Sequence, residues 1–539
     1  MNLIKPNRTE YAKVRVPSDQ LLGGQHFAAT YAAEHVAGGE FVIGAAFAAW
    51  GASPMAVLMG LVIGNLLAVL SWAWVCAPVA VRARLTLYEY LTRMAGVGFV
   101  RVFNVVNGVI FLVIAGGMMT ISAQAIQGAM GLPAQMNWYP DDAIFVVLVG
   151  LVGAVVVLIS LMGFRQLTNF ARYVSPYLFV IFGVCTLASF PILWQAGRSA
   201  NLGFGEIFSA YVWTSSGEKS LSMWHIAAFT WGLNLPLHLG LADMSTLRFA
   251  KKWQYGYHSV WACYGGHFVA WVGAGMLGAG SAMLIGTSVH ELDIGGVVVP
   301  ILGVAGVLAV VLASITTAVP SLYRAALAFD ALWHVGFAKT VLLLGVLTTA
   351  VACFPLIFLK WLDLMAYFNI VMAPVGAMIA AEHFILARLG VRPFWHDGGA
   401  YNMRAVMTWL FGLVLAVGLF TSGVHLFFIF IPVWFLCVVF YVLMAYPKAQ
   451  KQSTPLPLLH DAAYGVDEYI SVWQPRQPKR TFGRFVVLMA MLLMCLPLYV
   501  VEPAEMLGVF QLGLFVLSVL YFVMVGHQMM REKHSKFKP

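Results

Sequence analysis

Apolar runs long enough to cross a lipid bilayer fill this sequence of 539 residues. A transmembrane helix needs about 20 predominantly apolar residues. Fourteen stretches meet that requirement, at residues 27–50, 54–80, 98–130, 143–163, 168–194, 223–242, 257–286, 298–333, 340–359, 362–385, 405–421, 424–446, 485–501 and 506–528. Hydrophobic residues make up 61% of the chain and charged residues 10%, whereas soluble globular chains have about 45–50% and about 25%. The sequence therefore excludes a soluble enzyme and predicts an all-α polytopic membrane protein of about 14 transmembrane helices.

The positions of the basic residues give these helices an orientation. Cytoplasmic loops of membrane proteins carry more Lys and Arg than external loops do. With the amino terminus inside, 28 of the 31 Lys and Arg residues fall on the cytoplasmic side, Arg324 among them, and only Arg198, Lys219 and Lys360 fall outside. We therefore expect a multi-pass protein of the plasma or inner membrane with both termini in the cytoplasm. This topology accounts for the net charge of +9 without a nucleic-acid partner.

The remaining polar segments and the cysteines indicate no further domain. Residues 1–23 are polar and basic, so they are expected to form a cytoplasmic tail and not a signal peptide. Residues 195–222 are predicted to form an external loop, residues 447–484 a cytoplasmic loop and residues 529–539 a second cytoplasmic tail. All six cysteines stand alone within apolar runs, which is typical of buried hydrophobic residues and not of disulfides or zinc sites.

Two of the predicted helices contain breaks at corresponding positions. The first carries two glycines and a carboxylate at residues 38–40, and the sixth carries Gly232, Asn234 and Pro236. Transporters with inverted repeats often form their binding sites where two discontinuous helices meet at the middle of the bilayer. Because the breaks lie five helices apart, the second five-helix unit enters the membrane from the opposite side. The sequence thus predicts a first repeat at residues 24–194, an inverted second repeat at 223–387, helices 11 and 12 at 388–446, and helices 13 and 14 at 485–528.

Ionisable groups inside these helices indicate a functional site. A charge at bilayer depth is costly, so Glu34 and Glu40 are expected to face a polar cavity or to be protonated. The structural alternative is that both carboxylates merely satisfy the broken backbone of the first helix. For His35, His238 and His267, an interhelical hydrogen bond is the favoured interpretation and a proton relay is the alternative.

The eighth helix carries a group of oxygen atoms suited to a cation. Thr316 and Thr317 follow Ala313 by three and four residues, so their hydroxyls share a helix face with its carbonyl. Such oxygens suit a hard monovalent cation, provided that carbonyls of the broken first helix complete the shell. The alternative is ordinary hydrogen bonding of each threonine to its own helix, which is common in membrane proteins.

Several segments together resemble the nucleobase-cation symporter family, which comprises permeases of purines, cytosine, uracil, allantoin and hydantoins. The resemblance rests on residues 241–251 after the sixth helix, residues 312–327 of the eighth, residues 374–388 at the end of the tenth, and Gly60, Gly64 and Asn65 of the second. It covers roughly residues 24–446. It implies a LeuT-type fold of five-plus-five inverted repeats, here followed by four additional C-terminal helices.

The resemblance also implies site residues. The sodium site would use carbonyls near Val36 and Gly39, the carbonyl of Ala313, and the hydroxyls of Thr316 and Thr317. The substrate site would be formed by Gly38, Glu40, Gly117, Gln124, Trp231 and Asn234. The sequence departs from the family in the third helix, where residues 115–124 lack the tryptophan on which a flat heterocycle stacks. A carboxylate at Glu40 favours a substrate with hydrogen-bond donors or positive charge, or a proton as the coupled ion.

These features predict a secondary active transporter that couples the symport of a small polar organic solute, nucleobase-like or hydantoin-like, to sodium or protons by alternating access. Its expected partners are that solute, the coupling cation and the bilayer, and a sodium ion is the one cofactor considered. An amine or amino acid carried on the same fold is the first alternative, and a transporter-like receptor or channel is the second. A membrane-embedded enzyme using Glu34, His35 and Glu40 is least favoured, because no HExxH motif or nucleotide-binding loop accompanies them.

Overall fold

The computed structural model describes residues 10–445 and 482–535, except 134, 136, 215–220, 356–360, 390 and 392–398. Its regular elements are helices, and one isolated β-bridge joins Leu22 to Ala250. The helices are α1 (Gly24–Glu34), α2 (Glu40–Ala49), α3 (Pro54–Ser71), α4 (Ala77–Ala83), α5 (Leu87–Ala95), α6 (Val97–Ala129), α7 (Ala143–Leu161), α8 (Phe164–Ser199), α9 (Phe204–Ile207), α10 (Met223–Gly232), α11 (Leu235–His238), α12 (Met244–Leu247), α13 (Val269–Ile285), α14 (Ile294–Trp333), α15 (Phe337–Ala352), α17 (Trp361–Ala380), α18 (Met403–Thr421), α19 (Phe430–Ala445), α20 (Phe482–Leu493), α21 (Pro497–Val500) and α22 (Pro503–Ser535).

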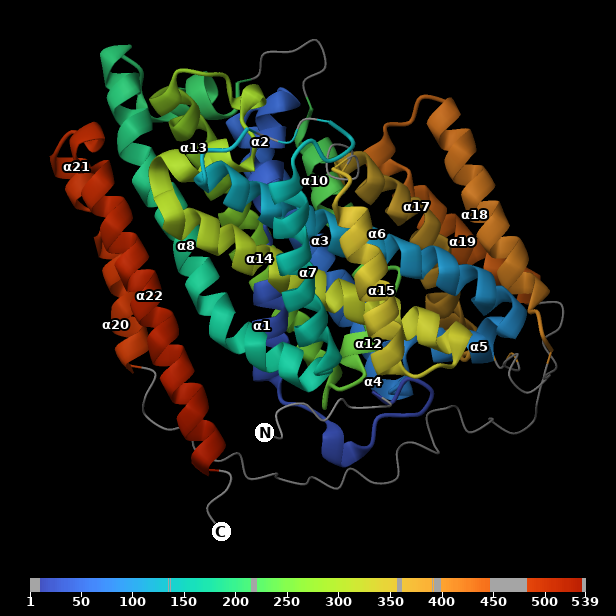
Figure 1. The fold of residues 1–539 in the computed structure, drawn as a ribbon. Coiled ribbons are helices and arrows are strands. Elements are labelled where there is room, and N and C mark those ends of the chain that lie inside the picture. The colour runs from blue at the N-terminus through green and yellow to red at the C-terminus, as the bar shows by residue number, and fades with distance from the viewer. Residues whose placement is uncertain are drawn as a thin grey trace.

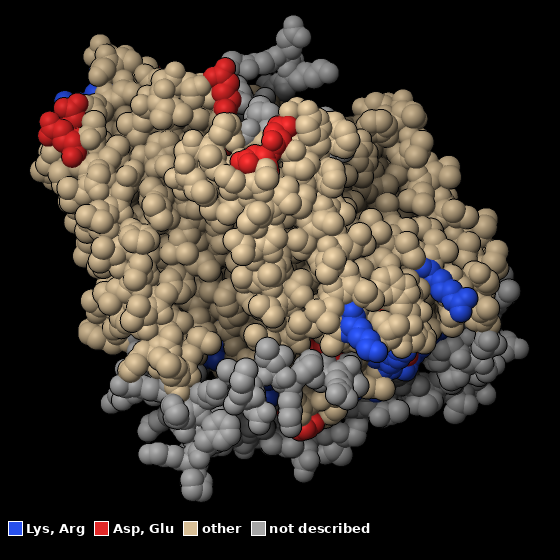
Figure 2. Space-filling view, viewed as in Figure 1, with Lys and Arg blue, Asp and Glu red and all other residues tan. Residues whose placement is uncertain are grey.

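Each apolar run predicted to span the membrane contains a helix. Among the described residues, eleven helical segments are long and apolar enough to cross a bilayer. The run at 340–359 forms the shorter α15, and the runs at 27–50 and 223–242 are each divided into two helices. Figure 2 shows a wide band without charged side chains, with mainly Asp and Glu at its upper edge and mainly Lys and Arg at its lower edge. The chain is therefore a multi-span integral membrane protein, as its composition predicted.

The contacts between helices follow the inverted repeat. The third helices of the two repeats, α6 and α14, pack along each other, and so do the fourth helices, α7 and α15. The second half of the broken first helix, α2, packs on the seventh helix, α13, while the first half of the broken sixth helix, α10, packs on the second helix, α3. Taken as whole helices, these last two pairs, the first with the seventh and the sixth with the second, are exchanged by an operation that relates each helix to the helix five places later. The half-helices in contact are not the equivalent ones, since α2 is a second half and α10 a first half. The two five-helix units are thus related by a pseudo-two-fold axis.

Glycines bring the helices of these last two pairs into close contact. A Cβ atom on Gly44 of α2 would lie 2.6 Å from the carbonyl oxygen of Trp271 in α13. In the same way, a Cβ atom on Gly64 of α3 would lie 2.5 Å from the carbonyl oxygen of Ala227 in α10. Small residues permit such backbone approach where helices cross in a membrane. Both broken helices are thereby held against an unbroken neighbour.

The additional helices form two pairs on opposite sides of the ten-helix core (Figure 1). α18 and α19 pack on α17, whereas α20 and α22 pack on α8 and α14. Within α14 the helix is interrupted at Gly303, whose φ is 59°. There the side-chain nitrogen of Gln511 in α22 donates to the carbonyls of Val299, Pro300 and Ile301 at 3.4, 2.9 and 3.4 Å. Helix α22 therefore satisfies carbonyls that the interruption leaves without helical partners.

The first described residues and the end of α22 lie at the same end of the bundle (Figure 1). The guanidinium of Arg248, which is 0% exposed, donates to the carbonyls of Glu10 and Tyr11, both at 2.7 Å. Part of the segment predicted as a polar tail is thus attached to the bundle. The predicted loop at 447–484 lies outside the described residues up to residue 481, as do Lys219 and Lys360 of the charge analysis.

Candidate functional site

The broken first helix leaves an irregular stretch inside the protein. α1 ends at Glu34 and α2 begins at Glu40, so residues 35–39 separate two half-helices. Gly38 permits this path, because a Cβ atom there would collide with the hydroxyl oxygen of Ser314 in α14. The last carbonyls of α1 and the first N–H groups of α2 have no partners within their own helices. The break therefore presents polar backbone groups to the interior.

The broken sixth helix has its interruption at residues 233–234, between α10 and α11. Pro236 stands in the first turn of α11, where its missing N–H removes no helical hydrogen bond. Asn234 precedes α11 as its N-cap residue without using its side chain as a cap. The asparagine side chain is thus available for contacts outside the helix.

A cavity lies between the two breaks. It measures about 650 Å³, its open part included. It is lined by Glu34, His35, Ala37, Gly39, Glu40, Ile43, Phe111, Ile114, Met118, Leu233, Asn234, Pro236, Leu237, Thr317, Ser321 and Met365. Most of these side chains are apolar, two are carboxylates, and none of the described lining residues is Lys or Arg.

Glu40 is a buried carboxylate with a neutral partner. Its residue surface is 5% exposed, and one carboxylate oxygen, Oε2, accepts a hydrogen bond from the indole N–H of Trp271. Among the described residues, no Lys or Arg forms an ion pair with it. Within the described part of the chain, no positive side chain therefore balances the charge that Glu40 carries when ionised.

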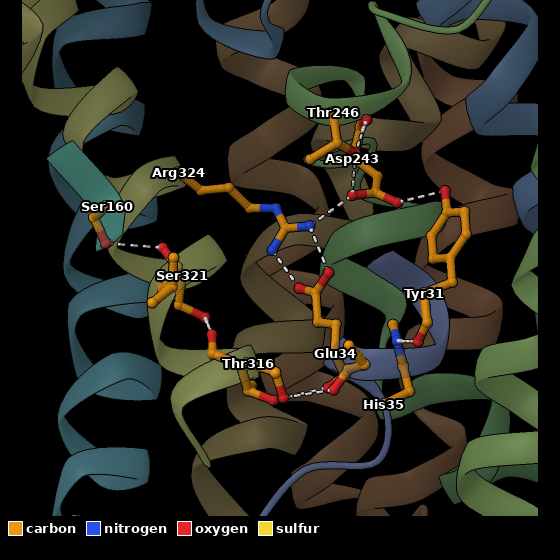
Figure 3. Close-up of polar contacts among 12 residues, drawn as sticks. Tyr31, Glu34, His35, Ser160, Asp243, Thr246, Thr316, Ser321 and Arg324 are labelled. Carbon is orange, nitrogen blue, oxygen red and sulfur yellow. Dashed lines mark hydrogen bonds and ion pairs between the residues drawn. The ribbon is translucent and has the colours of Figure 1, made fainter. Parts of the chain in front are cut away.

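Glu34, by contrast, belongs to a buried ion-pair cluster. The guanidinium of Arg324 in α14 pairs with Glu34 and, at 2.7 Å, with Asp243 before α12 (Figure 3). Tyr31 and Trp72 donate to the other oxygen of Asp243 at 2.8 and 2.9 Å. Buried ion pairs need such additional hydrogen bonds to offset the loss of hydration. The cluster ties α1 to α14 and to the segment that follows α11.

Arg324, which lies inside the predicted run at 298–333 and was counted among the cytoplasmic charges, is a buried residue of α14. Its side chain is 1% exposed. The sequence places Arg324 near the end of an apolar run but does not show which residues surround it. The two carboxylates that hold it come from segments 81 and 290 residues away in the chain.

Oxygen atoms of α1 and α14 converge beside the cavity. The hydroxyl of Thr316 donates to the carbonyls of Ala33 at 2.7 Å and Ala313 at 2.8 Å. The hydroxyl of Thr317 donates to the carbonyls of Glu34 at 2.8 Å and Ala313 at 3.4 Å. Three carbonyl and two hydroxyl oxygens thus gather at the end of α1.

The eighth-helix part of the predicted cation site lies in this group, namely Ala313, Thr316 and Thr317. The first-helix carbonyls differ from the predicted ones. The threonines contact Ala33 and Glu34, whereas the prediction named Val36 and Gly39, which lie in the irregular stretch after α1. The carbonyls at the end of a helix lack helical partners, so those in the last turn of α1 can also accept hydrogen bonds from the threonines.

The predicted substrate residues separate into two groups. Glu40 and Asn234 line the cavity, and Gly38 lies next to the lining residues Ala37 and Gly39. Gly117 and Gln124 of α6 and Trp231 of α10 are not among the lining residues. The indole N–H of Trp231 donates to Ser71 in α3 at 3.0 Å, and its ring packs edge-on against Phe430 in α19.

The wall that α6 contributes escaped the sequence analysis. It consists of Phe111, Ile114 and Met118, which are spaced three and four residues apart and so occupy one helix face. That spacing is visible in the sequence, but the family resemblance places the aromatic residue of the third helix within residues 115–124. The first residue of the wall, Phe111, stands one turn before that stretch.

The three interior histidines each have a hydrogen-bond partner. His267 lies 3.0 Å from the side-chain nitrogen of Asn234 and 3.4 Å from the side-chain oxygen of Asn65. His238 contacts the carbonyl of Trp231 at 3.0 Å. His35 contacts the carbonyl of Tyr31, also at 3.0 Å. Each ring is thus held by at least one hydrogen bond, whereas Nε2 of His35 and Nδ1 of His238 have no partner among the described residues.

Comparison with solved structures identifies the fold. Mhp1, a nucleobase-cation-symport-1 family transporter, in a closed conformation with bromovinylhydantoin bound, matches with a TM-score of 0.57 over 86% of this chain and 99% of its own, at 14% identity. The inward-facing conformation of Mhp1 gives 0.58 over 83% and 95%, at 16% identity. A Na+-coupled sialic acid symporter in a substrate-bound outward-open state gives 0.57 over 84% and 95%, at 13% identity. No protein-family model and no curated protein matches the sequence. The predicted LeuT-type fold is confirmed.

Proposed function

We propose that this protein is a secondary active transporter that couples the symport of a small polar organic solute to a cation, sodium or a proton, by alternating access. The observation that carries the proposal is the oxygen cluster formed by Ala33, Glu34, Ala313, Thr316 and Thr317 directly beside the cavity. A solute site and a cation site at two helix breaks are the arrangement expected of a transporter with inverted repeats.

The donor set of the cluster favours sodium over a proton as the coupling ion. All five atoms are uncharged oxygens, and hard cations prefer oxygen ligands over nitrogen or sulfur. The threonine hydroxyls can turn their hydrogens away and offer lone pairs to an ion that enters between α1 and α14. A sodium ion would then replace the direct hydrogen bonds that now join these helices.

Shared residues link the two sites. Thr317 and Glu34 belong to the oxygen cluster and also line the cavity. A cation in the cluster and a solute in the cavity would therefore each fix residues that the other contacts. Two ligands that stabilise the same arrangement raise each other's affinity by the same factor. This reciprocity is the basis of coupling in the proposed mechanism.

The neighbouring structures support the same function, since Mhp1 is a nucleobase-cation-symport-1 family transporter and the other neighbour is a Na+-coupled symporter. We further propose that both termini face the cytoplasm, because Lys and Arg gather near the end of the bundle where the first described residues and the end of α22 lie (Figures 1 and 2). Solute, cation and lipid are then the partners, and the protein catalyses no chemical reaction.

Uptake into proteoliposomes tests the proposal. A thermal-shift screen of the purified protein against nucleobases, hydantoins, amines and amino acids, in sodium or in potassium, first identifies a solute that stabilises it. The labelled solute is then offered with an inward sodium gradient, an inward proton gradient or neither. Accumulation above equilibrium that requires a cation gradient supports symport. Rapid equilibration without any gradient would instead indicate a channel, and binding without flux a receptor.

The threonine pair tests the cation site separately. Thr316→Ala combined with Thr317→Ala should raise the sodium concentration for half-maximal uptake about tenfold or more, which corresponds to ~1.4 kcal/mol of ion binding. Thr408→Ala is the matched control, because the buried Thr408 hydroxyl donates within its own helix, to the backbone carbonyl of Arg404 at 2.7 Å. Unchanged sodium dependence in the double variant would contradict the site.

A further inference from the structure

Three polar side chains on the cavity wall, those of Glu40, Asn234 and His35, each offer a hydrogen-bond acceptor. At Glu40, Oε2 accepts the indole N–H of Trp271. The second oxygen, Oε1, has no hydrogen bond to any residue that the structure describes. The carboxylate thus retains lone pairs for a ligand and has no donor of its own when ionised.

Asn234 offers its side-chain carbonyl oxygen as a second acceptor. Its side-chain nitrogen lies 3.0 Å from Nε2 of His267, and because an amide nitrogen only donates, Nε2 must accept. A neutral His267 then carries its proton on Nδ1, which lies 3.4 Å from the acceptor oxygen of Asn65. The chain of hydrogen bonds is consistent in direction and uses one of the two N–H groups of the Asn234 amide. Its side-chain oxygen has no partner within the described part of the chain.

His35 supplies a third acceptor. Its Nδ1 lies 3.0 Å from the carbonyl of Tyr31, which only accepts, so Nδ1 carries the proton. In the neutral ring the other nitrogen, Nε2, bears a lone pair. That nitrogen is buried and has no partner among the described residues, and the His35 residue is 2% exposed. A buried acceptor without a partner beside a cavity points to a ligand that donates.

Both acidic residues that line the cavity, Glu34 and Glu40, carry a negative charge when ionised. Of its two carboxylates, Glu34 is paired with Arg324, whose single positive charge is shared with Asp243. Glu40 has no counter-ion among the described residues. An unpaired buried charge is strongly unfavourable. A bound cation would remove that cost, whereas an anion would add a second uncompensated charge of the same sign.

We propose that the substrate is a compact organic cation with N–H donors, an ammonium or amidinium group attached to an apolar body. Its head binds Oε1 of Glu40, with the side-chain oxygen of Asn234 and Nε2 of His35 as further acceptors. Its body lies against the apolar wall formed by Ile43, Phe111, Ile114, Met118, Leu237 and Met365. This inference rests on the proposed transport function and adds the chemical class of the solute.

Matched ligands separate charge from shape. The thermal shift of the purified full-length protein in sodium is measured with benzylamine, benzyl alcohol and benzoate, and with benzamidine and benzamide. We expect the two cations to stabilise the protein and their neutral and anionic counterparts to bind at least about tenfold more weakly. Trimethylbenzylammonium keeps the charge but has no N–H donor, so it should also bind more weakly. Equal binding by benzyl alcohol or benzoate would overturn the proposal.

Variants locate the charge that matters. Glu40→Gln should weaken benzylamine binding at least about tenfold. Glu382→Gln is the control, because Glu382 is also a buried glutamate with a neutral donor, Tyr441 at 3.0 Å, but lies outside the cavity. Undiminished benzylamine binding in Glu40→Gln would overturn the inference. If this variant also lost proton-driven uptake, Glu40 would serve proton coupling and not substrate binding. If Glu40→Gln does not fold, the ligand series on the unaltered protein decides alone.

The same measurements keep this inference apart from the proposed function. If neutral or anionic solutes bind and accumulate under a sodium or proton gradient, the symporter proposal holds and the cationic substrate class is wrong. If organic cations bind through Glu40 but no imposed gradient drives their uptake, the substrate class holds and the symporter proposal is wrong.

Discussion

Tyr31→Phe should weaken the attachment of α1 to the buried charge cluster. The substitution removes a hydroxyl that donates to Oδ2 of Asp243 at 2.8 Å, and the two residues are 3% and 0% exposed, so bulk water does not take its place. A hydrogen bond to a charged group contributes about 1.5–3 kcal/mol. Because Trp72 still donates to the same oxygen at 2.9 Å, we expect a loss of about 1.5–2 kcal/mol in the free energy of unfolding.

A double-mutant cycle with Asp243→Asn shows whether the charge is the cause. In the asparagine background the hydroxyl meets a neutral amide, and such a bond contributes about 0.5–1.5 kcal/mol. The cost of Tyr31→Phe should therefore fall by about 1 kcal/mol, which is a measurable coupling for residues in contact. The assay is reversible unfolding by sodium dodecyl sulfate in mixed micelles, followed by tryptophan fluorescence.

Tyr177→Phe is the control for this cycle. Its buried hydroxyl lies 3.2 Å from the hydroxyl of Ser518 and 3.5 Å from the carbonyl of Ala305, both neutral groups. Tyr177→Phe should lower the free energy of unfolding by about 0.5–1.5 kcal/mol whether position 243 holds Asp or Asn. If Tyr31→Phe costs no more than this control, or costs the same in both backgrounds, the charge of Asp243 does not anchor α1.

Three further predictions concern other parts of the molecule. Gln511→Leu should lower the free energy of unfolding by about 1–3 kcal/mol, because carbonyls at the interruption of α14 lose their donor; the same detergent titration measures it. Gly38→Ala should abolish gradient-driven uptake, because its Cβ atom would collide with α14, whereas Gly150→Ala, with no atom within 4 Å, should leave uptake unchanged. Burial and the neighbouring His225 lower the pKa of His425, in the turn between α18 and α19, from its ordinary 6.5. The folded state then binds fewer protons than the unfolded state, so stability should fall as the pH drops below about 6.5, and the melting temperature of His425→Gln should fall less over that range.

The breaks in the first and sixth helices could be predicted because they depend on local chemistry. Gly38, Gly39 and Pro236 interrupt helices by their own backbone properties, and the structure interrupts both helices there. The orientation of Thr316 and Thr317 on one face of the eighth helix follows from helical periodicity alone. Features of this kind need no knowledge of the neighbouring helices.

The residues that meet across helices could not be predicted in the same way. Trp231 was expected in the substrate site, but the rotation of α10 directs its indole to Ser71. The carbonyls facing the threonines belong to Ala33 and Glu34, because the axial offset between α1 and α14 selects the last turn of α1. Such rotations and offsets are set by packing over whole helices, and no single residue of either helix encodes them.

The hydrogen bonds from Gln511 to α14 bear on how the molecule can move. Any rotation of α14 relative to α22 lengthens these contacts, the shortest of which is 2.9 Å. Either the two helices travel together as one rigid body, or every turnover includes the rupture and repair of these bonds. In the first case α22, which lies outside the two five-helix repeats, moves with α14 of the second one. A description of the moving parts that includes only the first twelve helices would then leave out a helix that is hydrogen-bonded to α14.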